Sequence, residues 1–271
     1  MSCVLCGSGA SDTLYLVGGR KIVKCRGCGL VRTEGTPLVS YKAYHRDQDY
    51  QKFKKMFQNI FLKRQKIIER FVKNRGRVLD IGASTGTFLE LFKRKGWEVW
   101  GVEPSKSGDI AKRKAIKILK ETFEKAELPK NYFDVVILNH TLEHVENPIL
   151  VLKKVKEVLK KGGILFVDVP NFGGLSSKIF GRYWRYLTPE EHLFHFTKES
   201  LGKILKKAGF KVIHQESRSG LLEYGNPLVE LWEALQSLKK RFFTDLATFP
   251  IALLSTYLNM GNSMTLIGEK R

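Results

Sequence analysis

The sequence predicts an α/β fold in which a largely parallel sheet carries helices on both faces, with a small cysteine-rich unit at the N-terminus. Apolar runs such as 133–138 indicate strands buried on both faces, and segments with helical periodicity separate them. All four cysteines lie within the first 28 residues, apart from these runs. The 271 residues suffice for one such domain and an appendage.

The cysteines form two pairs, Cys3-x-x-Cys6 and Cys25-x-x-Cys28, and a glycine follows each pair. Two such turns direct four thiolates at one point, which is the ligand set of a structural zinc site. Disulfides are the alternative, and a reducing compartment disfavours them. We therefore expect a zinc ribbon over residues 1–40, with short strands at 13–17 and 21–24. It is either purely structural or a cover over the site of the next domain.

Residues 41–74 are expected to be a linker followed by helices that cap the sheet. Aromatic and polar residues dominate 41–50, whereas apolar residues recur at helical spacing from 51 to 74. The main domain is then expected to span residues 75–271.

The first strand of that domain is expected at 78–81, followed by a glycine turn and a helix. Asp80 lies at the end of the strand, where the crevice of a parallel sheet binds ligands. The turn contains Gly82, Ser84 and Gly86, and its glycines allow close approach of a ligand to the backbone. The next strand, 99–102, leads into Glu103, whose carboxylate can accept both hydroxyls of a ribose.

The pairing of Asp80-x-Gly82-x-x-x-Gly86 with Glu103 resembles class I S-adenosylmethionine-dependent methyltransferases. Ser84 departs from their usual central glycine, and the GxGxxG pattern of dinucleotide sites is not met. The resemblance implies a Rossmann-like sheet of seven strands. It also implies an S-adenosylmethionine site made by Asp80, Gly82, Ser84, Gly86 and Glu103, with Phe123 and Glu124 in a loop over the adenine ring.

A second resemblance follows the expected strand at 133–139. The segment 139–148 contains the letters LEHV at 142–145 and resembles the fourth motif of small-molecule methyltransferases. It brings Asn139 to the cofactor and His140, Glu143 and His144 to the same rim. These three residues share one face if the strand runs into a helix there, because they stand at i, i+3 and i+4.

On this basis we expect His144 to act as the base and Glu143 to orient it, with His192 or His195 as the alternative. The resemblance to quinol O-methyltransferases implies a divalent metal at this motif, held by two acids and the histidine. His140 replaces the first acid here, which disfavours a hard metal, although two histidines and a glutamate suit a transition metal.

The remainder of the chain continues the alternating pattern. We expect helices at 148–159 and 198–208, and strands at 116–119, 164–169, 211–214 and 265–268. The aromatic and histidine-rich stretch 172–197 has the composition of a substrate pocket. A helical insertion is expected at about 220–260, and its apolar part, 246–258, is too short to span a bilayer. That part either packs on the sheet or a second copy, which we favour, or rests on a membrane surface.

The formal net charge of +20 predicts a surface that attracts anions, unless it is merely a solvated lysine-rich surface. The zinc knuckles resemble those of sugar C-methyltransferases, which act on nucleotide-linked sugars, and a basic surface suits such diphosphates. We therefore expect a small-molecule acceptor, an anionic or phosphorylated sugar or else a phenol or quinol. The less favoured alternatives are an RNA methyltransferase and a non-catalytic binding protein. The first residues contain no apolar leader, so a cytoplasmic location is expected.

Overall fold

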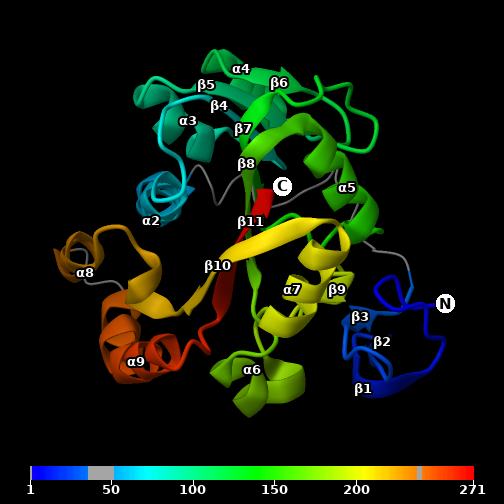
Figure 1. The fold of residues 1–271 in the computed structure, drawn as a ribbon. Coiled ribbons are helices and arrows are strands. Elements are labelled where there is room, and N and C mark those ends of the chain that lie inside the picture. The colour runs from blue at the N-terminus through cyan, green and yellow to red at the C-terminus, as the bar shows by residue number, and fades with distance from the viewer. Residues whose placement is uncertain (1, 36–51, 237–239) are drawn as a thin grey trace.

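The computed structural model describes residues 2–35, 52–236 and 240–271 (Figure 1). The predicted linker residues 41–50 lie outside the described part of the chain. Seven strands form one large sheet. They are β4 (Arg77–Ile81), β5 (Glu98–Val102), β6 (Lys117–Leu119), β7 (Phe133–Asn139), β8 (Leu159–Pro170), β10 (Phe210–Arg218) and β11 (Ser263–Lys270).

The large sheet has the order β10-β11-β8-β7-β4-β5-β6. β11 runs antiparallel to both of its neighbours, and the pairs from β8 to β6 are parallel. The chain moves outward from β4 to β6 and then returns to place β7 on the other side of β4. Such a switch point leaves a crevice at the carboxyl ends of β4 and β7. The predicted α/β fold with a Rossmann-like sheet of seven strands is confirmed.

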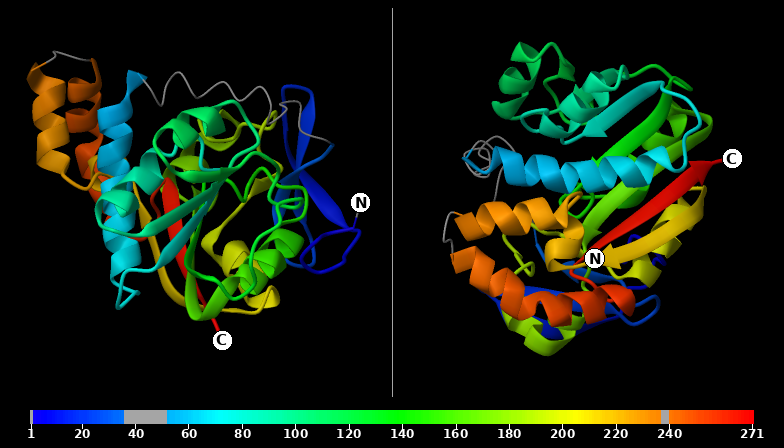
Figure 2. Two further views of the ribbon diagram at one scale, coloured as in Figure 1. Left: turned by 90° about the horizontal axis from the view of Figure 1, so that it is seen from above. Right: turned by 90° about the vertical axis from the view of Figure 1, so that its left-hand side faces the viewer.

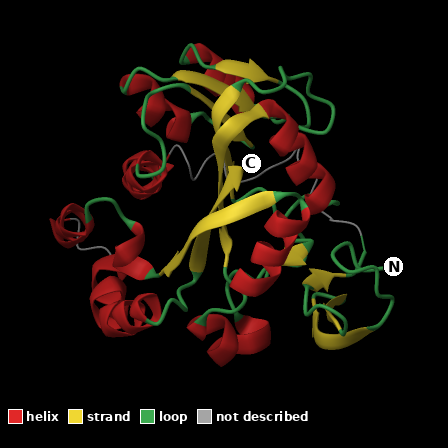
Figure 3. Ribbon diagram, viewed as in Figure 1, coloured by secondary structure: helices red, strands yellow, loops and turns green. Residues whose placement is uncertain are grey.

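Helices cover both faces of this sheet, as Figure 3 shows. On one face lie α2 (Lys54–Glu69), α3 (Thr87–Arg94) and α4 (Ser107–Arg113), and on the other α5 (Pro148–Val158) and α7 (Lys198–Lys207). Alternate residues of β7 feed the two cores. Val135 and Ile137 pack with the first group of helices, and Val136 and Leu138 with the second. This alternation explains why the strand sequence is apolar throughout.

A second, smaller sheet has the order β1-β2-β3-β9. The N-terminal region supplies β1 (Ser11–Val17), β2 (Arg20–Cys25) and β3 (Val31–Thr33), in agreement with the predicted strands at 13–17 and 21–24. The fourth strand, β9 (Phe194–His195), comes from the main domain and pairs antiparallel with β3. The N-terminal unit is therefore joined to the main domain by backbone hydrogen bonds, which the sequence did not predict.

The segment between β8 and β9 contains α6 (Leu175–Phe180) and the 3₁₀ turn η2 (Gly181–Tyr183). Between β10 and β11 lie η3 (Gly220–Glu223), α8 (Pro227–Gln236) and α9 (Lys240–Tyr257). The expected insertion is thus a helical hairpin, in which α9 remains helical through Pro250. Figure 2 shows α8 and α9 beside α2, not on either face of the sheet.

Among the described residues, no helix combines the length and the apolar character that crossing a bilayer requires.

Candidate active site

The predicted cofactor residues meet at the carboxyl ends of β4 and β5, which we call the cofactor edge. Glu103 follows β5 directly and is buried. Its Oε2 accepts a hydrogen bond from the Ser84 backbone N–H at 2.8 Å, and its Oε1 accepts one from the Ser105 N–H at 2.9 Å. The carboxylate is therefore fixed in orientation, and each oxygen keeps a second lone pair for a ligand.

Asp80 lies beside Glu103 and is also buried. Burial raises the pKa of Asp80 well above its usual value, and repulsion from Glu103 raises it further. Its Oδ1 has no hydrogen-bond partner among the described residues. Buried polar atoms normally have hydrogen-bond partners, so a cationic ligand bound here would supply the partner that Asp80 Oδ1 lacks.

The turn between β4 and α3 adopts left-handed backbone conformations. The φ angles are 80° at Gly82, 47° at Ser84 and 71° at Gly86. A Cβ on Gly82 would lie 2.7 Å from Thr141 Oγ1, and a Cβ on Gly86 would lie 2.6 Å from Ile116 Cδ1. Internal packing thus requires both glycines. Their sequence pattern indicates a different reason for them, the close approach of a ligand to the backbone.

The other expected cofactor residues, Phe123, Glu124 and Asn139, have different settings. Phe123 is buried in the larger core, and Lys154 Nζ lies 5.1 Å from its ring centroid. The neighbouring Glu124 is exposed. Asn139 ends β7, and its Oδ1 has no hydrogen-bond partner in the described part of the chain.

The histidines and Glu143 gather at the ends of β7 and β8, which we call the acceptor edge. Residues 140–147 form a turn with His140 at a φ of 52°, so His140, Glu143 and His144 do not share the face of a helix. The turn still brings the side chains together. His140 Nδ1 lies 3.3 Å from Glu143 Oε1. His144 Nδ1 lies 3.0 Å from the Glu191 carbonyl oxygen, so this carbonyl fixes the ring.

His192 joins this group from the segment before β9. Its ring centroid lies 4.8 Å from that of His144, and its Nδ1 lies 3.1 Å from the Tyr186 carbonyl oxygen. One ligand atom from each of Glu143, His144 and His192 lies within 4.8 Å of the others. All three side chains are buried. From the sequence, His192 is expected only as an alternative base, and no spacing in the sequence indicates that it lies next to His144.

The charges of the acceptor edge follow from burial and neighbours. Burial acts to raise the pKa of Glu143, but the His140 ring 3.3 Å from its Oε1 and the adjacent histidines outweigh burial and lower the pKa to about 2. Burial lowers the pKa of His192 and of His195 to about 3. At neutral pH the ionised carboxylate of Glu143 therefore lies near the neutral imidazoles of His192 and His195.

Asp168 is a central residue of this edge that the sequence predictions missed. It lies in β8 and is fully buried, with Arg64 Nη2 2.7 Å from its Oδ1 and Arg218 Nη2 3.4 Å from its Oδ2. His140 Nε2 lies 3.2 Å from Arg64 Nη2 and 3.6 Å from Asp168 Oδ1. Burial acts to raise the pKa of Asp168, but the two guanidinium groups lower it to about 2.

The small sheet contacts the acceptor edge directly. Thr33 in β3 donates a hydrogen bond from Oγ1 to the His192 carbonyl at 2.7 Å, and the same oxygen lies 3.0 Å from His195 Nε2. The N–H groups of Leu193 and Phe194 donate to the Glu143 carbonyl at 2.8 and 3.1 Å. The N-terminal unit thus reaches the acceptor edge through a single short segment.

Two groups of described residues have the composition of metal sites. The first is Cys3, Cys6, Cys25 and Cys28, whose sulfur atoms all lie within 4.8 Å of one another. The Sγ atoms of Cys3 and Cys28 are 3.5 Å apart, as are those of Cys6 and Cys25, and these four thiols, all in the described part of the chain, form no disulfide.

The second group is Glu143, His144 and His192. His140, which the sequence offered together with Glu143 and His144 as a candidate transition-metal site, is not part of this group. The Arg64 guanidinium lies 3.2 Å from His140 Nε2 and would repel a cation there.

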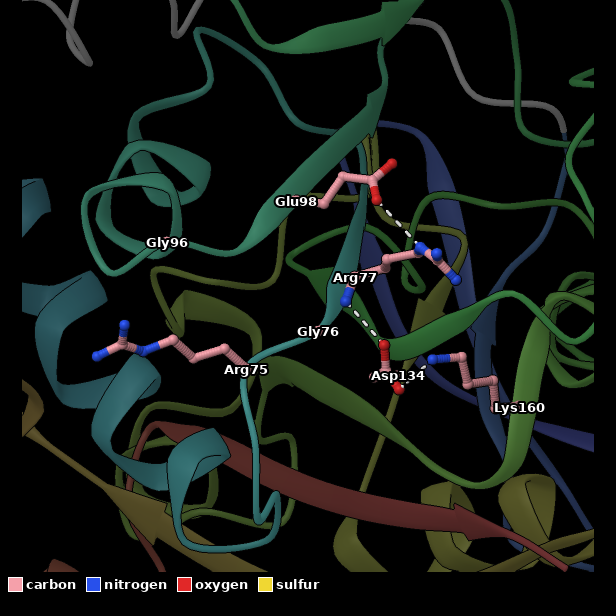
Figure 4. A pocket seen from close by; sticks show the side chains of 7 residues that line it. All are labelled: Arg75, Gly76, Arg77, Gly96, Glu98, Asp134 and Lys160. Atoms are coloured by element: carbon pink, nitrogen blue, oxygen red, sulfur yellow. Dashed lines mark hydrogen bonds and ion pairs between the residues drawn. The ribbon is translucent and has the colours of Figure 1, made fainter.

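A shallow pocket lies at the opposite end of the sheet, near the starts of β4, β5 and β7 (Figure 4). Asp134 accepts hydrogen bonds from the Arg77 backbone N–H at 2.7 Å and from Lys160 Nζ at 2.6 Å, and Arg77 Nε lies 3.0 Å from Glu98. Figure 4 shows Arg75 pointing away from these groups. These ion pairs satisfy one another, and the amino ends of parallel strands are not where such sheets bind ligands.

Residues 52–215 match the model of a methyltransferase domain family. Among curated proteins, an uncharacterized protein of Methanocaldococcus jannaschii is 29% identical over 140 residues, or 51% of this chain and 66% of that protein. A ubiquinone biosynthesis O-methyltransferase of Nitrobacter winogradskyi is 29% identical over 154 residues, or 46% of this chain and 56% of that protein. The matches therefore span between about half and two thirds of these relatives.

Solved structures share the fold. A phosphoethanolamine N-methyltransferase of Haemonchus contortus in complex with S-adenosyl-L-methionine has a TM-score of 0.59 and 18% identity, covering 89% of this chain and 62% of that chain. An S-adenosylmethionine-dependent methyltransferase of Archaeoglobus fulgidus has a TM-score of 0.56 and 22% identity, covering 82% of this chain and 99% of that chain.

Proposed function

The chain belongs to the methyltransferase domain family and is an S-adenosylmethionine-dependent methyltransferase, and we propose that it methylates a hydroxyl group of a small-molecule acceptor. The observation that carries this proposal is the cover over the acceptor edge. Thr33 of the small sheet and the segment that holds His192 both lie against this edge. A covered site suits a small acceptor, whereas a polymer requires an open groove.

We propose that Asp80 and Glu103 hold the cofactor. S-adenosylmethionine supplies an electrophilic methyl group on a sulfonium when it is bound. Glu103 is oriented by two backbone N–H groups and has lone pairs available for the ribose hydroxyls. Asp80 has a buried oxygen without a partner in the described chain, and the cationic methionine end of the cofactor suits it. Gly82, Ser84 and Gly86 shape the turn, with Asn139, Phe123 and Glu124 around it.

The residues of the acceptor edge are proposed to hold and deprotonate the acceptor. In-line displacement at a methyl group needs alignment of the reacting atoms, and a base is needed only because a hydroxyl must lose its proton. We assign this role to His144, whose ring the Glu191 carbonyl fixes. Glu143 provides a negative charge beside it, and His140 and His192 flank the pair.

Two acceptor classes are supported by different observations. The similarity to ubiquinone biosynthesis O-methyltransferases favours a phenol or quinol. The net charge of +20 favours a second class, nucleotide-linked sugars, because their diphosphates are anionic.

The four N-terminal cysteines are proposed to bind one structural zinc ion. Their sulfur atoms converge, and Gly7 and Gly29 turn with φ angles of 76° and 77°. A unit of this size has too small a core to be stable without such a metal.

Methyl transfer from isotope-labelled S-adenosylmethionine to separate panels of catechols and quinols, nucleotide-linked sugars, and transfer RNA tests the acceptor class. We expect label in one of the two small-molecule panels and none in RNA. Transfer to RNA that declines steeply with added salt would instead support the RNA alternative. If calorimetry detects no binding of S-adenosylmethionine, the alternative of a non-catalytic binding protein would be supported.

A further inference from the structure

The hairpin formed by α8 and α9 exposes large apolar side chains along its outer face. Leu228 is 81% exposed in α8, and Tyr257 is 86% exposed in α9. The other exposed apolar side chains of the hairpin are Val229, Trp232, Leu235, Phe243, Leu246, Phe249, Ile251, Leu253, Leu254 and Leu258. A contiguous apolar surface of this kind marks an interaction site, because isolated soluble domains rarely expose one.

The inner face of the hairpin is made of small or polar residues. Ala234, Ala252 and Ser255 are buried, and Glu230 accepts a hydrogen bond from Asn59 of α2 at 3.1 Å. The large apolar residues are thus not a core that failed to pack. The helices are amphipathic, and their apolar side faces away from the protein.

Basic residues stand next to this surface. Lys52, Lys54 and Lys55 are exposed at the start of α2, and Lys55 Nζ lies 3.9 Å from Glu233 of α8. In Figure 2 the start of α2 lies beside the free end of the hairpin. The side chains of Lys239, Lys240 and Arg241 lie outside the described residues.

We propose that this hairpin docks on the surface of an anionic lipid bilayer, with its apolar face at the boundary of the acyl chains and the lysines among the headgroups. Amphipathic helices with aromatic and leucine residues on one side and cations beside them bind bilayers in this way. A symmetric contact between two copies is disfavoured, since it brings the same lysines of two chains of charge +20 together.

The docked hairpin lies close to the acceptor edge. Ala252 of α9 packs against Gly220 of η3. Glu223, at the end of η3, interacts electrostatically with Arg64 and Asp168 of the acceptor edge. Docking does not depend on the proposed acceptor, but it turns this side of the enzyme toward the bilayer.

Trp232 provides an intrinsic probe of docking. It is 60% exposed, whereas the other three tryptophans, Trp97, Trp100 and Trp184, are buried. We expect a blue shift of tryptophan emission when the full chain is mixed with vesicles of phosphatidylcholine and phosphatidylglycerol, and a weaker one with phosphatidylcholine alone. The Trp232→Phe variant should bind the same vesicles in a flotation assay without showing the shift.

The double variant Leu228→Glu and Leu254→Glu should lower vesicle binding at least about tenfold, because it places two charges in the apolar face. Leu150→Glu is the matched control, since Leu150 is 60% exposed on α5, and it should bind as the wild type does. Cofactor affinity measured by calorimetry should be equal in all of these proteins. Flotation of wild-type protein with neither vesicle would overturn the proposal. So would a wild-type dimer in light scattering that binds no vesicles and that the double variant converts to a monomer.

Discussion

The cofactor edge and the acceptor edge of this methyltransferase are built in different ways. The cofactor edge comes from two consecutive strands and their loops, in which Asp80, Ser84 and Glu103 lie close in sequence. The acceptor edge comes from α2, β7, β8, the segment before β9 and the N-terminal unit. The difference teaches that one local turn can build the proposed cofactor site, whereas the proposed acceptor site is assembled from parts that lie far apart in the sequence.

Replacement of the proposed base, His144, should give the largest difference between an effect on turnover and an effect on cofactor affinity. His144→Ala should lower turnover by about 100- to 10,000-fold, the usual contribution of a general base, while S-adenosylmethionine affinity stays unchanged. Steady-state kinetics and calorimetry measure the two quantities. His214→Ala is a matched control, because His214 pairs with Glu216 in β10 and takes no proposed part in the reaction. Equal turnover of the His144 variant and the wild type would remove His144 from the mechanism.

The buried charges of Asp168 are expected to make the acceptor edge essential for folding. Asp168→Asn removes the buried carboxylate that faces the guanidinium groups of Arg64 and Arg218, and leaves only Glu216 paired with Arg218, so the free energy of unfolding should fall by about 3–5 kcal/mol. Chemical denaturation measures it. Asp109→Asn, which breaks an exposed pair with Lys120, should leave the free energy of unfolding nearly unchanged.

The pH dependence of the Asp168 effect has a definite sign. Its pKa is about 2 in the folded protein and 3.8 ordinarily, so its stabilising effect is present above pH 4 and is lost as the pH falls toward 2. The difference between the wild type and Asp168→Asn should therefore shrink over that window. A difference that stays constant from pH 4 to pH 2 would contradict this assignment.

Loss of the proposed zinc site tests whether the N-terminal unit supports only the acceptor edge. Cys25→Ser should remove one equivalent of zinc by elemental analysis and lower turnover about tenfold, as is typical when a supporting shell is lost. Cofactor affinity should be unchanged. Thr33→Val isolates the contact, because it keeps the metal but removes the hydrogen bond to the His192 carbonyl. Weaker cofactor binding by either variant would show that the edges are coupled.

The smallest expected effect concerns Asp80. Its raised pKa means that its contribution to stability is present at low pH and is lost as the pH rises through the folded value. At neutral pH, Asp80→Asn should therefore stabilise the cofactor-free protein by about 1 kcal/mol and weaken cofactor binding. Thermal unfolding with and without S-adenosylmethionine measures both, and a destabilised cofactor-free variant would contradict the electrostatic account.

The fold and the cofactor edge follow from sequence because their signals are local. A strand, a glycine turn and an acidic residue after the next strand specify where Asp80 and Glu103 meet, without knowledge of the remaining chain. The alternation of β7 residues between two cores likewise appears as a continuous apolar run.

The acceptor edge could not be predicted in this way. Arg64 lies on an ordinary basic helix, and Thr33 lies in a short strand, so neither has a local pattern that indicates its partner. Asp168 was the one available signal, because it is a charged residue inside the apolar run of β8. Residues 140–147 form a turn and no helix, because His140 takes a left-handed conformation and its N–H donates a hydrogen bond to the Asp168 carbonyl at 2.8 Å.

Calorimetric titration of S-adenosylmethionine into the wild type, Glu103→Ala and Glu103→Gln tests the central claim most directly. The wild type should bind, and Glu103→Ala should lose at least about 100-fold in affinity, because two hydrogen bonds to a charged acceptor are removed. Glu103→Gln, which keeps the shape but not the charge, should fall between them. Equal affinity of all three proteins would contradict the placement of the cofactor between Asp80 and Glu103.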